Sequence, residues 1–273
     1  METTQLFAKK SEIRKEEAAA PEIIQTQSKK VVITVFAYKG DSKTYSSFSI
    51  PAKNDKVLAI SFDGMTRIIA EQFFAGQDIT VYDAIDSVKR PLYPLKMNGG
   101  KVTVEQSTEN GSANMMNLLK FAYEMPDNTY DFIIADGMNL CEKLAEAVMR
   151  YNHGVKFNAG CEWNWWDERN SIVNGLHSLF LNKAKKGVIY TVYPMNNDTL
   201  IEGERVINRS EVPKWAGDLL YQTLILLRMT KRYNKADNKN HYYARVETSK
   251  LKKVPSGVEY DITDKYLRDV LVW

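Results

Sequence analysis

A lysine and a threonine, Lys43 and Thr44, close a short polar stretch that follows the apolar run VVITVF. In a phosphate-binding loop of pattern G-x-x-x-x-G-K-[ST], backbone N–H groups hold phosphate oxygens, the lysine reaches the terminal phosphates and the hydroxyl binds Mg²⁺. The stretch AYKGDSKT, residues 37–44, follows a predicted strand and keeps Gly40, Lys43 and Thr44. It predicts phosphate binding, and a plain polar loop after a strand is the competing interpretation.

Two residues of this stretch depart from the pattern. Ala37 replaces the first glycine, and Ser42 replaces the glycine before the lysine. Ala37 is a small change, whereas Ser42 adds a Cβ where the loop is expected to need φ > 0 and close approach to a nucleotide. These departures leave open whether a bound nucleotide is also hydrolysed.

Two carboxylates follow later apolar runs. Asp136 ends YDFIIAD, and Asp63 follows VLAISF. Magnesium-nucleotide chemistry needs one acid to position the metal and another to activate the attacking water. A helix N-cap or a turn is the competing interpretation for Asp136, and a turn is the competing one for Asp63, which precedes Gly64. The order of the three features along the chain favours a nucleotide site over chance.

The elements that must position these residues alternate in type. Short β-branched runs are separated by segments with apolar residues at three- and four-residue steps, which predicts a mostly parallel twisted sheet with helices on both faces. The predicted strands are 31–37, 56–62, 79–84, 130–136 and 187–193, and the predicted helices are 112–125, 139–151 and 168–186. After Pro213 we expect a helix, a strand and an antiparallel extension. Polar loops are expected at about 152–167 and 195–213.

Length and composition indicate one soluble globular core. The chain has 273 residues, 44% hydrophobic and 26% charged, and its net charge of +3 neither demands nor excludes a polyanionic partner. Residues 1–29 are expected to be a flexible tail before a core at 30–273. Cys141 and Cys161 have neither zinc-site nor disulfide-framework spacing, and no apolar run approaches the ~18 residues of a membrane helix. A cytoplasmic protein without membrane contact is expected.

From Val31 to Thr263 the chain resembles the core ATPase domain of the RecA/RadA recombinase superfamily, in particular the core-only type of phages and archaeal elements. The order of motifs carries the likeness: AYKGDSKT as a degenerate Walker A loop, SFDG, YDFIIADGMN, GVIYTVYP, and ARVETSKL with GVEYDIT as a closing hairpin. The resemblance implies a RecA-type P-loop NTPase fold with a C-terminal antiparallel hairpin. It also implies ATP and Mg²⁺ binding, a homo-oligomeric ring or filament, and action on single-stranded DNA in recombination or repair.

The resemblance also implies a role for each matching residue. Lys43 and Asp63 would be catalytic, and Thr44 and Asp136 would hold the metal. The further nucleotide-binding positions would be Tyr38, Lys39, Gly40, Asp41, Ser42 and Lys250, of which Lys250 would reach an adjacent subunit's phosphates.

Three positions differ from the pattern of relatives. Thr191 or Tyr193 would sense the γ-phosphate, although the usual amide or histidine is absent. Asp63 stands where relatives often carry the longer glutamate. The shorter side chain must sit closer to the substrate, which would slow hydrolysis.

Aromatic residues in the first polar loop suggest a nucleic-acid contact. Trp163, Trp165 and Trp166 lie among His153, Lys156 and Arg169, and aromatic side chains stack on unpaired bases. The competing interpretation places the tryptophans in the core or at a subunit contact. The second polar loop offers Arg205, Arg209 and Lys214, but as many acids.

Two rival functions remain. A degenerate, non-hydrolysing assembly or regulatory subunit would explain Ala37, Ser42 and Tyr193. A structural or virion-associated interaction protein whose α/β core imitates the motif order would bind no nucleotide.

Overall fold

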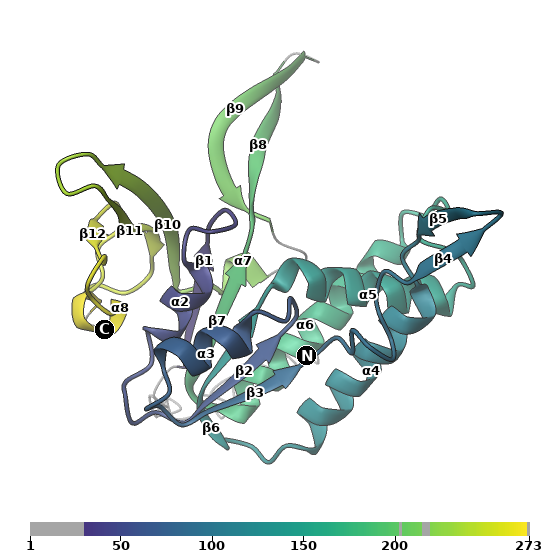
Figure 1. Cartoon of the computed structure of the whole chain (residues 1–273), viewed down its shortest axis with the longest axis horizontal. Helices are drawn as coiled ribbons and strands as arrows, with labels where there is room; N and C mark the ends of the chain where they lie inside the picture. Colours follow the sequence, from purple (N-terminus) through teal and green to yellow (C-terminus); the bar gives the residue numbers. More distant parts are fainter. Residues whose placement is uncertain (1–29, 202–203, 215–218, 272–273) are drawn as a thin grey trace, which may run out of the picture.

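A large, mostly parallel sheet forms the centre of the molecule (Figure 1). The computed structural model describes residues 30–201, 204–214 and 219–271, so the predicted tail 1–29 lies outside the described residues. The sheet order is β12-β11-β10-β1-β7-β6-β2-β3. The parallel strands are β1 (Val31–Phe36), β2 (Val57–Ser61), β3 (Ile79–Asp83), β6 (Tyr130–Asp136), β7 (Ala184–Val192) and β10 (Ile225–Asn234). The predicted α/β class is confirmed.

The closing strands run antiparallel, as predicted. β11 (Lys239–Ser249) pairs with β10, and β12 (Glu259–Asp261) pairs with β11. Neither is reached by a crossover helix, which an antiparallel pair does not need.

Helices cover both faces of the sheet. One layer contains α4 (Thr108–Glu124), α5 (Met138–Asn152) and α6 (Trp165–Lys183), and the other contains α2 (Lys43–Phe48), α3 (Thr66–Phe73) and α8 (Leu267–Val270). Strand β1 shows why two layers are needed: Val32 and Phe36 pack into one core cluster, and Ile33 and Val35 into the other. Successive side chains of a strand point to opposite faces, so a strand that is apolar throughout must be covered twice. Within the described residues no helix is long and apolar enough to cross a bilayer.

Three sequence-based boundaries are corrected. The segment 195–213, predicted as a loop, is a two-stranded ribbon of β8 (Pro194–Ile201) and β9 (Glu204–Pro213). The helix predicted for 168–186 ends at Lys183, and 184–186 already belong to β7. After Pro213, where one helix was predicted, the described residues contain two short ones, α7 (Leu219–Gln222) and α8.

A second ribbon carries no corresponding prediction. Strands β4 (Leu95–Asn98) and β5 (Lys101–Val104) form a separate two-stranded sheet. Both ribbons project from the body (Figure 1). A ribbon that lies outside the core does not need the apolar run by which a buried strand is recognised.

A buried histidine links α6 to the sheet. His177 is almost fully buried, and its Nδ1 is hydrogen-bonded to the hydroxyl of Tyr190 on β7. Burial lowers the pKa of His177 to about 4, because the charged imidazolium would lose its hydration. The folded protein therefore keeps this ring neutral.

We expect acid to destabilise the fold through His177. In the unfolded chain a histidine has a pKa near 6.5. Between about pH 6.5 and 4 the unfolded state therefore binds a proton at this residue that the folded state does not bind. The free energy of unfolding should fall by up to about 3 kcal/mol across this range. Urea unfolding at pH 7 and pH 4.5 measures the loss. His177→Gln should remove most of this slope, whereas His153→Gln, at an exposed position, should keep it; equal slopes in both variants would contradict the assignment.

Candidate functional site

A cleft of about 580 Å³ opens at the carboxyl edge of the parallel strands. This is the edge of an open α/β sheet where ligands are usually bound. Its polar side is lined by Lys39, Gly40, Ser42, Lys43, Thr44, Asp63 and Tyr193, and its other walls by Tyr45, Met65, Ile69, Phe73, Tyr242, Ile262 and Thr263. The cleft therefore brings together the two chain segments in which the sequence placed phosphate binding and a catalytic acid.

The loop between β1 and α2 turns through two residues of positive φ. Gly40 has φ 90° and Ser42 has φ 64°. The expectation that Ser42 occupies a position of positive φ is confirmed. For an L-residue other than glycine this conformation costs roughly 1–2 kcal/mol, so the loop keeps its shape against a local strain. Ser42 O then accepts the N–H of Ser46 at 2.8 Å and starts α2.

Lys43 presents its charge inside the cleft. The residue is only 6% exposed, and its Nζ lies 4.0 Å from the centroid of the Tyr193 ring. The ring face attracts a cation, so Tyr193 holds the ammonium group near the loop. The N–H of Tyr193 is fixed in turn by Asn139 Oδ1 at 2.7 Å.

Asp136 lies at the centre of a buried hydroxyl cluster. Thr44 Oγ1 donates to its carboxylate at 3.0 Å, Thr66 Oγ1 donates at 2.8 Å, and Thr191 Oγ1 also donates. Burial raises the pKa of Asp136, the charge of Asp63 adds to this rise, and the three hydroxyls oppose it. The side chain of Thr191 therefore serves Asp136 and does not line the cleft.

The order of the strands explains how these groups meet. In the sheet β7 lies between β1 and β6, and Asp136 pairs in register with Thr191 on β7 and Ser61 on β2. The loop after β1 must reach across the end of β7 to place Thr44 on Asp136. The carboxyl ends of three strands thus meet around one carboxylate.

The donors at this point fit a magnesium ion. Thr44 offers a hard oxygen ligand at the cleft, of the kind that Mg²⁺ prefers, whereas Asp136 is fully buried behind it and can act on an ion only through Thr44 or water. Among the described residues no group of three or more His, Cys, Asp or Glu side chains could hold a metal by itself. A site with so few protein ligands suits an ion that keeps water and takes phosphate oxygens from a substrate.

Asp63 is both a turn residue and a lining residue of the cleft. Its Oδ1 accepts the N–H of Met65 at 3.1 Å, and Gly64 follows with φ 77°. The turn predicted as the competing interpretation is therefore present. The same turn holds the carboxylate at the cleft, in the position in which the acid was expected.

Three predicted nucleotide-binding residues are not lining residues of the cleft. Tyr38 donates its hydroxyl to Glu211 at 2.7 Å, at the base of the β8–β9 ribbon. Asp41 is half-buried, and burial raises its pKa against the opposing charges of Lys231 and Lys43. Lys250 comes directly after Ser249, which pairs with Ile225 at the amino end of β10. It therefore lies at the opposite end of the strands from the loop. A contact of Lys250 with another subunit stays a prediction.

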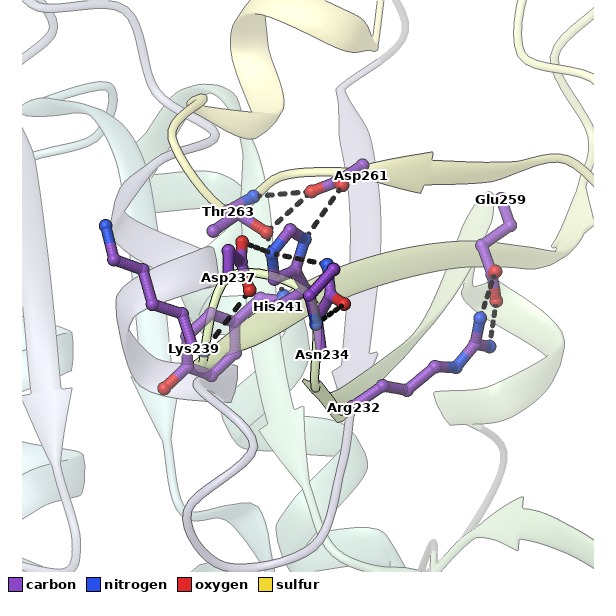
Figure 2. Close-up of polar contacts among 10 residues, drawn as sticks. Arg232, Asn234, Asp237, Lys239, His241, Glu259, Asp261 and Thr263 are labelled. Atoms are coloured by element: carbon purple, nitrogen blue, oxygen red, sulfur yellow. Dashed lines mark hydrogen bonds and ion pairs between the residues drawn. The ribbon is translucent and has the colours of Figure 1, made fainter.

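The closing hairpin supplies a wall that the sequence did not predict. Thr263 donates its N–H and its hydroxyl to Asp261 at 3.0 and 2.6 Å, and His241 lies between Asp261 and Asp237 (Figure 2). The hydrogen bond with Asp237 is the main cause of the raised pKa of His241. This network fixes the turn that presents Ile262 and Thr263 to the cleft.

The apolar part of the cleft is aromatic. Tyr45, directly after Thr44, meets Phe73 of α3 edge to face at 5.5 Å between ring centroids. Tyr242 completes this side from β11. Two sequence signals could have predicted this aromatic wall: the aromatic residue next to Thr44 and the Phe73-Phe74 pair.

The tryptophans of the first polar loop lie on the surface. Trp163 is 90% exposed, Trp165 stacks on His153 with ring centroids 4.0 Å apart, and the ring of Trp166 lies 4.8 Å from the guanidinium of Arg169. None of the three is buried. The alternative that placed them in the core is wrong.

Comparisons with known proteins give a remote likeness. No family model matches the chain, and no curated protein matches it. A solved structure similar to it is the crystal structure of a KaiC-like protein from the hyperthermophilic archaeon Pyrococcus horikoshii OT3, with 9% identity and a TM-score of 0.45 over 85% of this chain and 84% of that one. At this distance the likeness says nothing of ligand or activity, which must follow from this chain's own side chains.

Replacing Ser42 by glycine should stabilise the protein. Glycine adopts φ 64° without the Cβ penalty, so Ser42→Gly should raise the free energy of unfolding by about 1 kcal/mol. In a chain of this size that is about 2–4 °C in Tm, measured by calorimetry. Ser178→Gly, on the exposed side of α6, is the matched control and should lower stability by about 0.5–1 kcal/mol. A lower Tm for Ser42→Gly would contradict the strain.

Proposed function

We propose that the chain binds magnesium ATP in this cleft and hydrolyses it to ADP and phosphate. The observation that carries the proposal is the hydrogen bond of 3.0 Å between the hydroxyl of Thr44 and the buried carboxylate of Asp136. It joins the phosphate-type loop to a second strand end, as a metal-nucleotide site requires.

Each polar residue has a role in this reaction. Lys43 neutralises charge on the β- and γ-phosphates, and the amides around Gly40 donate to phosphate oxygens. Thr44 would ligate magnesium and Asp136 would hold it through water, and the ion would supply positive charge beside the phosphate oxygens. Asp63 orients the attacking water and accepts its proton. As the new oxygen–phosphorus bond forms, the bond from the γ-phosphorus to the bridging oxygen breaks, and that oxygen leaves with ADP.

The aromatic wall favours a nucleotide over a bare polyphosphate. Tyr45, Phe73 and Tyr242 surround the part of the cleft away from Asp136, where a flat apolar group can be buried. Cofactor sites commonly combine such an apolar wall with a few convergent polar groups. The base of ATP fits this side, with its phosphates directed to Lys43.

Two substitutions separate binding from hydrolysis. Lys43→Ala should weaken ATP binding by at least about tenfold, because the buried lysine held over Tyr193 is lost. Asp63→Asn should leave binding within about twofold and lower turnover by about 100-fold or more, as expected for a general base. Isothermal titration measures the first effect, and phosphate release with and without single-stranded DNA measures the second.

The same assays decide between the rival functions. ATP binding without turnover in the unmodified chain would identify a degenerate, non-hydrolysing subunit. No nucleotide binding at all would overturn the proposal and favour a structural or virion-associated interaction protein. Lys53→Ala, which changes an exposed lysine that does not line the cleft, is the control for non-specific charge loss.

A single-stranded DNA partner extends the proposal. It would place the protein in recombination or repair in the cytoplasm, as a homo-oligomer. Its support is the surface formed by Trp163, Trp166 and Arg169, where the Trp163 ring is exposed and the half-buried Trp166 ring lies beside a cation. Flat aromatic faces next to positive charge bind single strands without reading sequence.

Trp163→Ala should weaken binding of a labelled oligothymidine by roughly 5- to 150-fold, the range that corresponds to about 1–3 kcal/mol for one stacked base. Fluorescence anisotropy at a fixed salt concentration measures it. Trp163→Phe should restore most of the affinity. Tyr233→Ala, at another exposed aromatic, should have no effect. Equal losses for Trp163→Ala and Tyr233→Ala would argue against a stacking site at the loop.

A further inference from the structure

The β4–β5 hairpin exposes an apolar face. In its register Leu95 pairs with Val104 and Met97 pairs with Val102. Directly opposed residues, and residues two apart, share one face of an antiparallel pair. All four lie on that face, and their exposures are 73% for Leu95, 61% for Val104, 77% for Met97 and 62% for Val102.

The charged side chains lie on the other face. Lys96 pairs with Thr103 in the register, and its Nζ forms an ion pair with Glu105 at 2.9 Å. Lys101 shares this side by alternation. The hairpin is therefore amphipathic, although its apolar side does not belong to either core cluster of the described residues.

The hairpin is a defined structure and not a loose loop. Gly99 and Gly100 both have positive φ, 55° and 78°, which is the turn that matches the twist of two strands. Ser107 N donates to Leu92 O at 2.9 Å and closes the stem. The side chain of Asn110 donates to Pro91 O at 2.9 Å and holds the stem to α4.

The β4–β5 hairpin is expected to pack its apolar face against a partner. A lone two-stranded hairpin is at best marginally stable in water, and it becomes stable when its apolar face is packed. Contiguous exposed apolar patches mark interaction surfaces. Here the stem is anchored to the body, but the apolar face is left open.

We propose that the apolar face of this hairpin packs against the same face of a second copy of the chain. The face presents no charged side chain, and Lys96, Lys101 and Glu105 point away from it, so two copies related by a two-fold axis bring no like charges together. The long side chains Leu95 and Met97 on one strand and the short Val102 and Val104 on the other are complementary when the face meets its own copy.

The size of a stable interface extends the contact beyond the hairpin. About 800 Å² per partner is usual, more than one short hairpin offers. The preceding segment also exposes Val88 (90%) and Tyr93 (46%). We therefore add Val88 and Tyr93 to the contact and place the exposed Lys89 and Arg90 at its solvated rim. A two-fold contact closes a dimer, so this assembly is separate from a ring or filament and does not depend on nucleotide binding.

The test uses the full chain with all four apolar residues replaced by threonine: Leu95→Thr, Met97→Thr, Val102→Thr and Val104→Thr. Threonine keeps strand propensity, so the hairpin should persist. Sedimentation velocity over a range of protein concentrations should show association of the unmodified chain, weakened at least about tenfold in the variant. The matched control, Lys96→Thr with Lys101→Thr, changes the polar face and should associate normally.

Cysteine cross-linking tests the facing arrangement in a Cys161→Ser background. At least one of Leu95→Cys, Met97→Cys and Val102→Cys should form a disulfide between copies under mild oxidation, and Thr103→Cys should not. A chain that stays monomeric, a threonine variant that associates normally, or cross-linking only from Thr103→Cys would overturn the inference. Hairpin-dependent binding of the monomer to vesicles of anionic phospholipid would also overturn the inference, because the apolar face would then pack against a membrane.

The outcome is separable from that of the proposed function. A threonine variant that is monomeric but still binds ATP supports both. A chain that associates through the hairpin but binds no nucleotide supports this inference and overturns the function.

Discussion

The burial of one carboxylate organises the functional edge of this protein. Asp136 is fully enclosed, and an ionised group in that position is tolerated only if its oxygens are hydrogen-bonded. The donors come from three separate elements: Thr44 at the start of α2, Thr66 at the start of α3 and Thr191 on β7. Holding them together fixes the phosphate-type loop, the turn that carries Asp63 and the central strands in one arrangement. The cleft is the space left in front of that arrangement.

The loop above this carboxylate is built under local strain. Ser42 keeps a left-handed conformation that glycine would adopt freely, and Lys43 is held over the ring of Tyr193. Strain of this kind persists where surrounding contacts fix the backbone more firmly than the residue's own preference. The Thr44–Asp136 hydrogen bond and the start of α2 are those contacts. The chain thus keeps the cradle geometry with a residue that does not favour it.

The base of the β8–β9 ribbon is tied to the same loop. Tyr38 bonds to Glu211, which also pairs with Arg228 on β10, and Tyr193 begins the connection to β8. The β4–β5 hairpin, in contrast, is fixed through α4. One projection therefore contacts the cleft at its base, and the other leaves the body away from it (Figure 1). A shift of the loop between β1 and α2 would therefore act directly on the β8–β9 ribbon. It would act on the β4–β5 hairpin only through the body of the molecule.

Much of the fold follows from local pattern. The runs at Val31, Val57 and Tyr130 are apolar because strands covered on both faces must be, and that signal is readable without a structure. The loop motif, Asp63 and Asp136 were found because each follows such a run. The ribbons were not predicted as strands. The segment after Tyr193 has no long apolar run, and the turn signal at Gly99-Gly100 stands between strands of only four residues.

Contact between distant segments was decided by the tertiary structure alone. The sequence placed Thr44, Asp63 and Asp136 at strand ends, but no spacing shows that β7 lies between β1 and β6, or that Thr191 would turn to Asp136. It left Trp163 undecided between core and surface, because an aromatic in a polar loop suits either. It also gave no sign that Ile262 and Thr263 close the cleft. Local preference depends on neighbours in the chain, whereas a site depends on the order in which strands pair, and that order is set by burial of the whole core.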